Sequence, residues 1–163
     1  MDLKRQSAEK AIEYVADGMV LGLGTGSTTR IFIDLLGKRL QAGRLRNLKA
    51  VPTSQATAAQ ASSLGIPLTT LLEQPVLDLA VDGADEVDPQ LNLIKGLGRA
   101  LLREKIVEIH ARCFVVVADE TKLVSKLGRG PLPVEIAPFE AEAQVRWLGT
   151  LGCHAELWLE DDG

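Results

Sequence analysis

The chain reads Met19-Val20-Leu21 and then Gly22-Leu23-Gly24-Thr25-Gly26-Ser27-Thr28-Thr29, so a short apolar run leads through a glycine-rich turn into a helix-like stretch. Glycines let the backbone approach an anion closely, and the N–H groups and dipole at a helix start favour negative charge there. No Gly-Lys-Ser/Thr follows, and the glycines lack the G-x-G-x-x-G spacing, so this is neither a Walker loop nor a dinucleotide fingerprint. By itself the turn predicts either an anion site or a plain strand–turn–helix.

The composition is that of an ordinary globular protein, with 163 residues, 46% of them hydrophobic, and a formal net charge of −4. This length fits one domain, or one domain plus part of another. The acidic balance argues against a general nucleic-acid binder, and neither a membrane-spanning run nor a signal-peptide core is present in the sequence. The two cysteines lack CxxC spacing and the two histidines are isolated, so we expect no metal site and a reduced, cytoplasmic protein.

Short apolar segments alternate with helical patterns through residues 1–130. The expected strands are 20–23, 48–51, 67–70, 76–81 and 114–118, and the expected helices are 3–16, 29–40, 54–64 with Ser54 as its N-cap, and 99–111. Short strands that are apolar on both faces are typical of a parallel sheet covered by helices. We therefore expect an α/β fold, with a Rossmann-like, mostly parallel sheet and helices on both of its faces.

The regular alternation of strand and helix patterns ends at the stiff connector Gly130-Pro131-Leu132-Pro133. A strand at 134–136, a helix at 140–151 and a strand at 154–159 are expected there. Such a strand–helix–strand piece cannot easily make a core of its own. Residues 131–163 are therefore predicted to be an incomplete, smaller α+β domain.

Three polar clusters, 22–29, 82–88 and 119–122, fall at the ends of predicted strands. Parallel sheets bind ligands at the carboxyl ends of their strands, so we expect these clusters to meet in one site. Asp82 and Asp85 flank two small residues, so both carboxylates can face one pocket, accept hydrogen bonds from sugar hydroxyls or move protons. The alternative is a plain acidic loop, and the spacing of a calcium-binding EF-hand is missing.

Lys95 precedes a glycine-containing turn, so its ammonium can contact a phosphate or a developing oxyanion, or it is simply an exposed lysine. Glu104 shares its side of the predicted helix with apolar neighbours such as Leu101 and Val107. Partial loss of solvent there raises the pKa of a glutamate toward that of a useful base. The alternative is a solvated glutamate on the outer face of the helix.

Together these motifs resemble the A-type ribose-5-phosphate isomerases. The matching segments are 22–28, 81–86, 94–96, 102–106 and 132–135, in this order. The resemblance implies reversible conversion of D-ribose 5-phosphate to D-ribulose 5-phosphate, in the non-oxidative pentose phosphate pathway, without a metal or organic cofactor. It also implies a pentose phosphate as the ligand, and a homodimer or homotetramer of the full-length chain. From the charge and the lack of a long apolar run we expect no nucleic-acid and no membrane partner.

The resemblance also assigns roles to residues. Glu104 would be the base that carries a proton between C2 and C1 through an enediolate, and Lys95 would stabilise the developing negative charge. Asp82 and Asp85 would assist ring opening and orient the hydroxyls. The other predicted substrate contacts are Thr25, Gly26, Ser27, Thr28, Gly83, Ala84, Gly96, Leu97, Gly98, Lys122 and Lys4.

Two features depart from the family pattern. Leu97 and Arg99 interrupt a turn that is richer in glycine and alanine in the family. Family members also continue well past residue 163, so we expect a small domain that lacks part of its support and has lowered stability. The alternative functions are a non-enzymatic sugar-phosphate sensor, an inactive isomerase fragment, and an amino-sugar-phosphate deaminase or coenzyme A transferase. The Arg103-Glu104-Lys105 context favours the isomerase.

Overall fold

The computed structural model describes residues 2–158 and separates two units, Met1–Pro133 and Val134–Gly163. The helices of the first unit are α1 (Leu3–Ala11), α2 (Ser27–Gln41), α3 (Gln55–Ser63) and α4 (Leu101–Ile109), with 3₁₀ turns η1 (Ile12–Tyr14) and η2 (Glu120–Lys122). Its strands are β1 (Val20–Leu23), β2 (Lys49–Pro52), β3 (Leu79–Asp82), β4 (Glu86–Val87), β5 (Leu93–Ile94) and β6 (Phe114–Val116).

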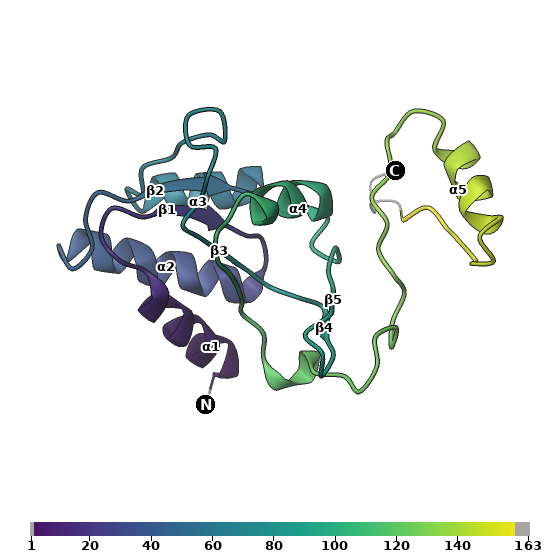
Figure 1. The fold of residues 1–163 in the computed structure, drawn as a ribbon, viewed down its shortest axis with the longest axis horizontal. Helices are drawn as coiled ribbons and strands as arrows, with labels where there is room; N and C mark the ends of the chain where they lie inside the picture. The colour runs from purple at the N-terminus through teal and green to yellow at the C-terminus, as the bar shows by residue number, and fades with distance from the viewer. Residues whose placement is uncertain (1, 159–163) are drawn as a thin grey trace. The chain divides into compact units, whose positions relative to one another are not determined.

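Four parallel strands form the main sheet in the order β2-β1-β3-β6, and β4 and β5 make a small antiparallel pair. Gly22 at the centre of β1 is aligned with Val51 on one side and Ala80 on the other. Helices α1 and α2 lie on one side of these strands and α4 lies on the other (Figure 1). The expected α/β class, a parallel sheet between helices, is confirmed.

The two faces of the sheet pack against different helices because side chains alternate along each strand. Leu21 and Leu23 of β1 belong to the larger core, together with Phe32 and other residues of α2. On the opposite face, a Cβ atom at Gly22 would lie 2.7 Å from Val107 Cγ1 of α4. Glycine therefore permits the close approach of α4, the helix that carries Glu104, to the sheet.

Most predicted boundaries of helices and strands in the first unit agree with the structure within two residues. Ser54 caps α3 as predicted, because its side chain accepts a hydrogen bond from the Thr57 N–H at 3.1 Å. The helix expected over 3–16 is α-helical only to Ala11 and then tightens into η1. The strand expected at 67–70 is reduced to one bridge between Ala50 and Leu68. It borders the edge strand β2, and Pro67, without an N–H group, cannot extend the ladder.

The second unit contains the helix α5 (Ala141–Gly149). The strands predicted at 134–136 and 154–159 are absent from its described part, and residue 159 lies outside the described residues. None of the residues 134–158 is buried. A strand needs a hydrogen-bonded neighbour and an apolar face to cover, and this short segment supplies neither, so its extended pieces stay unpaired.

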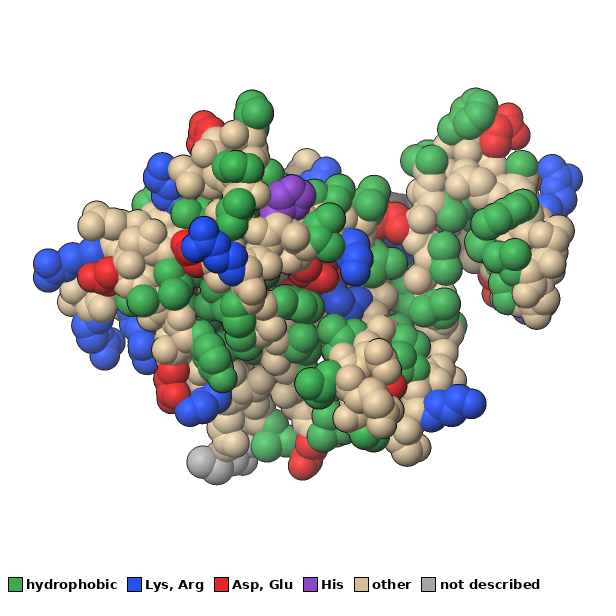
Figure 2. Space-filling view, viewed as in Figure 1, with side chains coloured by type: hydrophobic (Ala, Val, Ile, Leu, Met, Phe, Trp, Pro, Cys, Tyr) green, Lys and Arg blue, Asp and Glu red, His purple; other side chains and the backbone are tan. Residues whose placement is uncertain are grey.

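Acidic and basic side chains are mixed over the face shown in Figure 2, as expected for a chain with a net charge of −4. Within residues 2–158, no helix combines the length and the apolar character needed to cross a membrane.

Candidate active site

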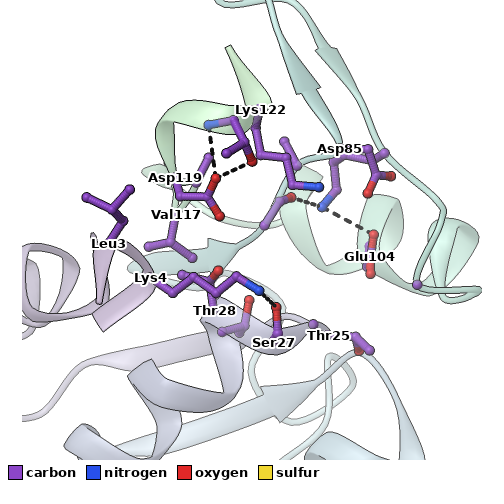
Figure 3. Close-up of a pocket in the computed structure, with 18 of the residues that line it drawn as sticks. Leu3, Lys4, Thr25, Ser27, Thr28, Asp85, Glu104, Val117, Asp119 and Lys122 are labelled. Atoms are coloured by element: carbon purple, nitrogen blue, oxygen red, sulfur yellow. Dashed lines mark hydrogen bonds and ion pairs between the residues drawn. The ribbon is translucent and has the colours of Figure 1, made fainter. Parts of the chain in front are cut away.

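A pocket of about 550 Å³ lies in the first unit, where the turns that follow β1, β3, β5 and β6 converge. Every site residue predicted from the sequence lines this pocket except Asp82 and Leu97. Figure 3 shows Lys4 and Ser27 on one side of the pocket, with Glu104 and Asp85 on the opposite side. The expected convergence of polar clusters at one edge of the sheet is confirmed.

The start of α2 forms one end of the pocket. Its N-cap, Gly26, has a φ of 142° and supplies no capping oxygen to the first turn of the helix. Lys4 reaches over from α1 and donates a hydrogen bond to Ser27 Oγ at 3.0 Å, as Figure 3 shows. Thr28 also lines this end, and Lys122 lines the pocket from η2, where its charge and that of Lys4 both act on Asp119. A lysine beside a helix N-terminus, with a second lysine near Asp119, makes this part of the pocket suited to a phosphate.

Thr25 lines the pocket, but its hydroxyl is bonded within the protein. Its Oγ1 lies 2.8 Å from Thr53 Oγ1 and donates to Ser54 Oγ at 2.9 Å. Thr57, in turn, donates to the backbone carbonyl of Gly24 at 2.9 Å. This hydroxyl network ties the glycine turn to the start of α3. Nothing in the local sequence pattern pointed to these partners, which lie about thirty residues away.

Asp82 lies beneath the pocket rather than in its lining, with only 1% of the residue exposed. Its Oδ1 accepts hydrogen bonds from the N–H groups of Thr25 (3.1 Å) and Gly83 (2.7 Å), and from the Thr29 hydroxyl at 3.4 Å. A Cβ atom at Gly24 would lie 2.0 Å from that same oxygen. Gly24 is therefore required by the buried carboxylate, and Asp82 in turn orients the glycine turn.

The ammonium of Lys95 is surrounded by three carboxylates. Its Nζ lies 3.2 Å from Asp82 Oδ2, 3.2 Å from Glu104 Oε2 and 3.2 Å from Glu108 Oε1, and it donates a hydrogen bond to Gly83 O. Apart from this contact, Asp82 Oδ2 and Glu108 Oε1 have no hydrogen-bond partner within the described chain. Lys95 therefore balances the charge of residues from β3 and α4.

Burial and the mutual charges change the acidity of this cluster. Burial raises the pKa of Asp82 to about 7, with Lys95 opposing the effect and Glu104 and Glu108 adding to it. Burial also raises the pKa of Glu104, again against the effect of Lys95. Burial lowers the pKa of Lys95, but the three carboxylates outweigh it and raise this pKa overall. The cluster therefore keeps Lys95 charged and makes Glu104 a better base than a solvated glutamate.

Glu104 is only 3% exposed, yet it lines the pocket. The expected loss of solvent is confirmed, and the alternative of a solvated glutamate on the outer face is wrong. The first turn of α4 presents this side chain to the pocket, on the helix that Gly22 admits close to the sheet. A desolvated carboxylate beside an ammonium can take up and release a proton next to a group that stabilises negative charge.

The acidic cluster also has the spacing of a cation site, because one oxygen from each of Asp82, Glu104 and Glu108 lies within 4.8 Å of the others. The Lys95 ammonium contacts all three of these acids. A metal ion in that position would have to displace the lysine, so the residues fit an ammonium better than a metal.

The turn after Lys95 accommodates Leu97 without strain, whereas Arg99 takes a backbone conformation that favours glycine. Positive φ angles occur at Gly96 (119°) and Arg99 (58°) but not at Leu97, so a leucine fits there. The Leu97 N–H donates to Asp85 Oδ2 at 3.0 Å. Gly96 and Gly98 line the pocket, whereas Leu97 holds Asp85 through its backbone.

Two further acids that the sequence analysis did not single out have defined partners, one of them in the site. Glu108 contacts Lys95. The sequence feature that could have identified it is its i, i+4 spacing from Glu104, which places both acids on one face of the helix. Glu86, 5% exposed, accepts hydrogen bonds from the N–H groups of Gly128 (2.7 Å) and Gly130 (2.9 Å). Burial alone would raise the pKa of Glu86, but these bonds outweigh it and lower this pKa. No sequence signal identified that loop as its partner.

Comparison with known proteins agrees with the motif pattern. The family model of ribose 5-phosphate isomerase A (phosphoriboisomerase A) matches residues 49–162. A ribose-5-phosphate isomerase A of Nitrobacter hamburgensis is 59% identical over 144 residues, which cover 88% of this chain and 61% of that protein. A probable ribose-5-phosphate isomerase 2 of Arabidopsis thaliana is 51% identical over 168 residues, covering 99% of this chain and 63% of that protein. The chain thus spans about three fifths of the length of these curated relatives.

Solved structures give the same result. A D-ribose-5-phosphate isomerase in complex with phospho-erythronic acid has a TM-score of 0.94 and 44% identity, with 99% of this chain and 71% of that chain covered. Ribose 5-phosphate isomerase A of Methanocaldococcus jannaschii has a TM-score of 0.93 and 44% identity, with 99% and 72% covered. Fold and sequence therefore point to one family.

Proposed function

Because the chain belongs to the ribose 5-phosphate isomerase A family, we propose that it interconverts D-ribose 5-phosphate and D-ribulose 5-phosphate. One observation carries this proposal: a desolvated glutamate, Glu104, lines a phosphate-suited pocket and is paired with Lys95 at 3.2 Å. An aldose–ketose isomerase needs a base, a cation near the developing oxyanion and an anchor for the phosphate. The pocket offers side chains for all three tasks.

The phosphate of the sugar would bind at the start of α2, held by Lys4, Ser27, Thr28 and Lys122. Figure 3 shows that this end of the pocket lies across from Glu104. Binding energy from the phosphate, which takes no part in the reaction, would position the carbon atoms at the base. The sugar would then extend from the lysines toward Glu104 and Asp85.

In the proton transfer, the Glu104 carboxylate would remove the proton from C2 of the open-chain aldose. The C1–C2 bond becomes double, and negative charge collects on O1, where the Lys95 ammonium would stabilise it. Glu104 then returns the proton to C1, and the hydroxyl proton moves from O2 to O1. Atoms and charge balance, since the reaction only relocates hydrogen within the sugar.

Asp82 would support this chemistry from below the pocket. It holds Lys95 through Oδ2 and the glycine turn through Oδ1, and it does not line the pocket. Asp85, which does line the pocket, is the carboxylate placed to meet sugar hydroxyls. We therefore propose that Asp82 positions Lys95 and that Asp85 contacts the substrate.

The test is conversion of ribose 5-phosphate to the ketose by this chain and by Glu104→Gln, with Glu13→Gln as the control. Glu13 is an exposed acid paired with Lys10, and it does not line the pocket. Glu104→Gln should lose about 10²–10⁴-fold in kcat, the usual contribution of a general base. The control should match the unmodified chain. Equal turnover by Glu104→Gln would refute the assigned base.

A sugar-phosphate sensor of the same fold is the competing function. It predicts that calorimetry detects binding of ribose 5-phosphate while no ketose forms with any variant. A cytoplasmic location, and a homodimer or homotetramer of the full-length protein, stay predictions. Sedimentation of this chain at several concentrations is the first measurement for its assembly.

A further inference from the structure

Glu108 is a largely buried carboxylate without a role in the proposed reaction. It lies on α4 one turn after Glu104, its side chain is 10% exposed, and it does not line the pocket. Its Oε1 lies 3.2 Å from Lys95 Nζ and has no hydrogen-bond partner in the described part of the chain. Two carboxylates on one face of a helix repel each other, so this arrangement opposes helix stability unless the lysine compensates it.

Lys95 connects Glu108 to the base. The ammonium lies 3.2 Å from both Glu104 Oε2 and Glu108 Oε1. Of these three residues, Lys95 and Glu104 line the pocket and Glu108 does not. Buried ion pairs contribute little net stability, because desolvation of both charges offsets their attraction. Stability alone therefore gives no reason for a third carboxylate on this lysine.

We propose that Glu108 is a positioning residue, which holds the Lys95 ammonium from outside the pocket lining and thereby keeps Glu104 strongly basic. This rests on the proposed isomerase function, in which Glu104 is the base. Glu108 itself would touch neither substrate nor reacting atoms. Its effect would pass through the position of Lys95 and through its own charge.

The groups around Glu104 determine the direction of the effect. Lys95 approaches from the end of β5, Asp82 from the end of β3, Asp85 from the turn after β3, and Glu108 from α4. Burial raises the pKa of Glu104, Lys95 lowers it, and the charges of Glu108 and Asp85 raise it. Neutralising Glu108 removes one like charge and leaves Lys95 shared among fewer carboxylates. Both changes make Glu104 a weaker base.

The experiment compares Glu108→Gln with the unmodified chain by two readouts. Carbon-13 NMR of the Glu104 side-chain carboxyl follows its titration, and a pH series follows kcat and KM for ribose 5-phosphate. In Glu108→Gln, Glu104 should titrate at lower pH, and the acid limb of the kcat profile should move with it. We expect kcat to fall roughly three- to thirtyfold, well short of loss of the base, with KM within about twofold.

Glu13→Gln is the charge-matched control and should leave the Glu104 titration unchanged. If Glu108→Gln fails to fold, Glu108→Asp replaces it. The shorter side chain moves the carboxylate away from Lys95, so Glu104 should again titrate at lower pH, but with a smaller change than in Glu108→Gln. An unchanged or higher titration of Glu104 in the folded variant overturns the proposal. If the unmodified chain shows no turnover, the proposed function fails, and the carboxyl titration still decides the role of Glu108.

Discussion

Replacing Lys95 by methionine should destabilise the first unit strongly at neutral pH. Each carboxylate at 3.2 Å from Nζ attracts the ammonium by about 5 kcal/mol at an effective dielectric constant near 20. The carboxylate oxygens lie within 4.8 Å of one another, so at the same dielectric constant each pair repels by at least about 3–4 kcal/mol. Desolvation of the lysine offsets much of this electrostatic energy. We therefore expect Lys95→Met to lower the free energy of unfolding by about 3–5 kcal/mol, as for other broken buried ion pairs.

The loss from Lys95→Met should depend on pH. Lys95 holds down the pKa values of Asp82 and Glu104, which burial already raises, so both rise further without it. A carboxyl group whose pKa is higher in the folded state binds more protons there, and stability falls as pH rises between its two pKa values. The destabilisation should therefore grow from about 1 kcal/mol near pH 5 to the full 3–5 kcal/mol near pH 8.

The assay is urea unfolding at both pH values, followed by amide hydrogen exchange in β1 and β3. Tryptophan fluorescence would report on the wrong unit, because Trp147 and Trp158 both belong to the second one. Lys10→Met, which removes an exposed lysine, is the control and should leave the free energy of unfolding essentially unchanged. A loss below about 1 kcal/mol at pH 8, or an equal loss at both pH values, would refute the reasoning.

Three further substitutions test other parts of the site. Gly24→Ala should lower the free energy of unfolding in urea by about 3 kcal/mol, because the new Cβ would lie 2.0 Å from Asp82. Gly43→Ala is the control: Gly43 has a φ of 67° and open space around it, so the loss there should be about 1–2 kcal/mol. Glu86→Gln should speed amide hydrogen exchange at residues 128–130, after η2, at least about tenfold. The Glu86 carboxylate accepts three backbone N–H bonds from this loop, and an amide cannot replace it. Unchanged protection of these amides would contradict this. Lys122→Met should raise KM for ribose 5-phosphate about tenfold and leave kcat nearly unchanged, and steady-state kinetics showing the reverse would count against a phosphate contact.

Local patterns predicted much of this protein. The glycine turn, the cap at Ser54 and the alternation of strands and helices depend on residues close together in the chain, so they could be identified without the structure. The strands expected in the second unit failed because strand pairing depends on a neighbour that a local pattern cannot supply. Thr25 was predicted to contact the substrate, and it lines the pocket, but its hydroxyl bonds to Ser54 and Thr57, which a local pattern cannot show.

The residue pattern was enough to predict the α/β class and the gathering of polar residues at one edge of the sheet, because parallel strands bring their carboxyl ends together. The separate positions of these residues, on which their different roles depend, follow from the packing of the folded chain. It placed Asp82 beneath the pocket, Glu104 in its lining and Glu108 behind Lys95. Burial and charge at distances of a few ångströms set the acidity of such a cluster, and these arise only when β3, β5 and α4 pack together.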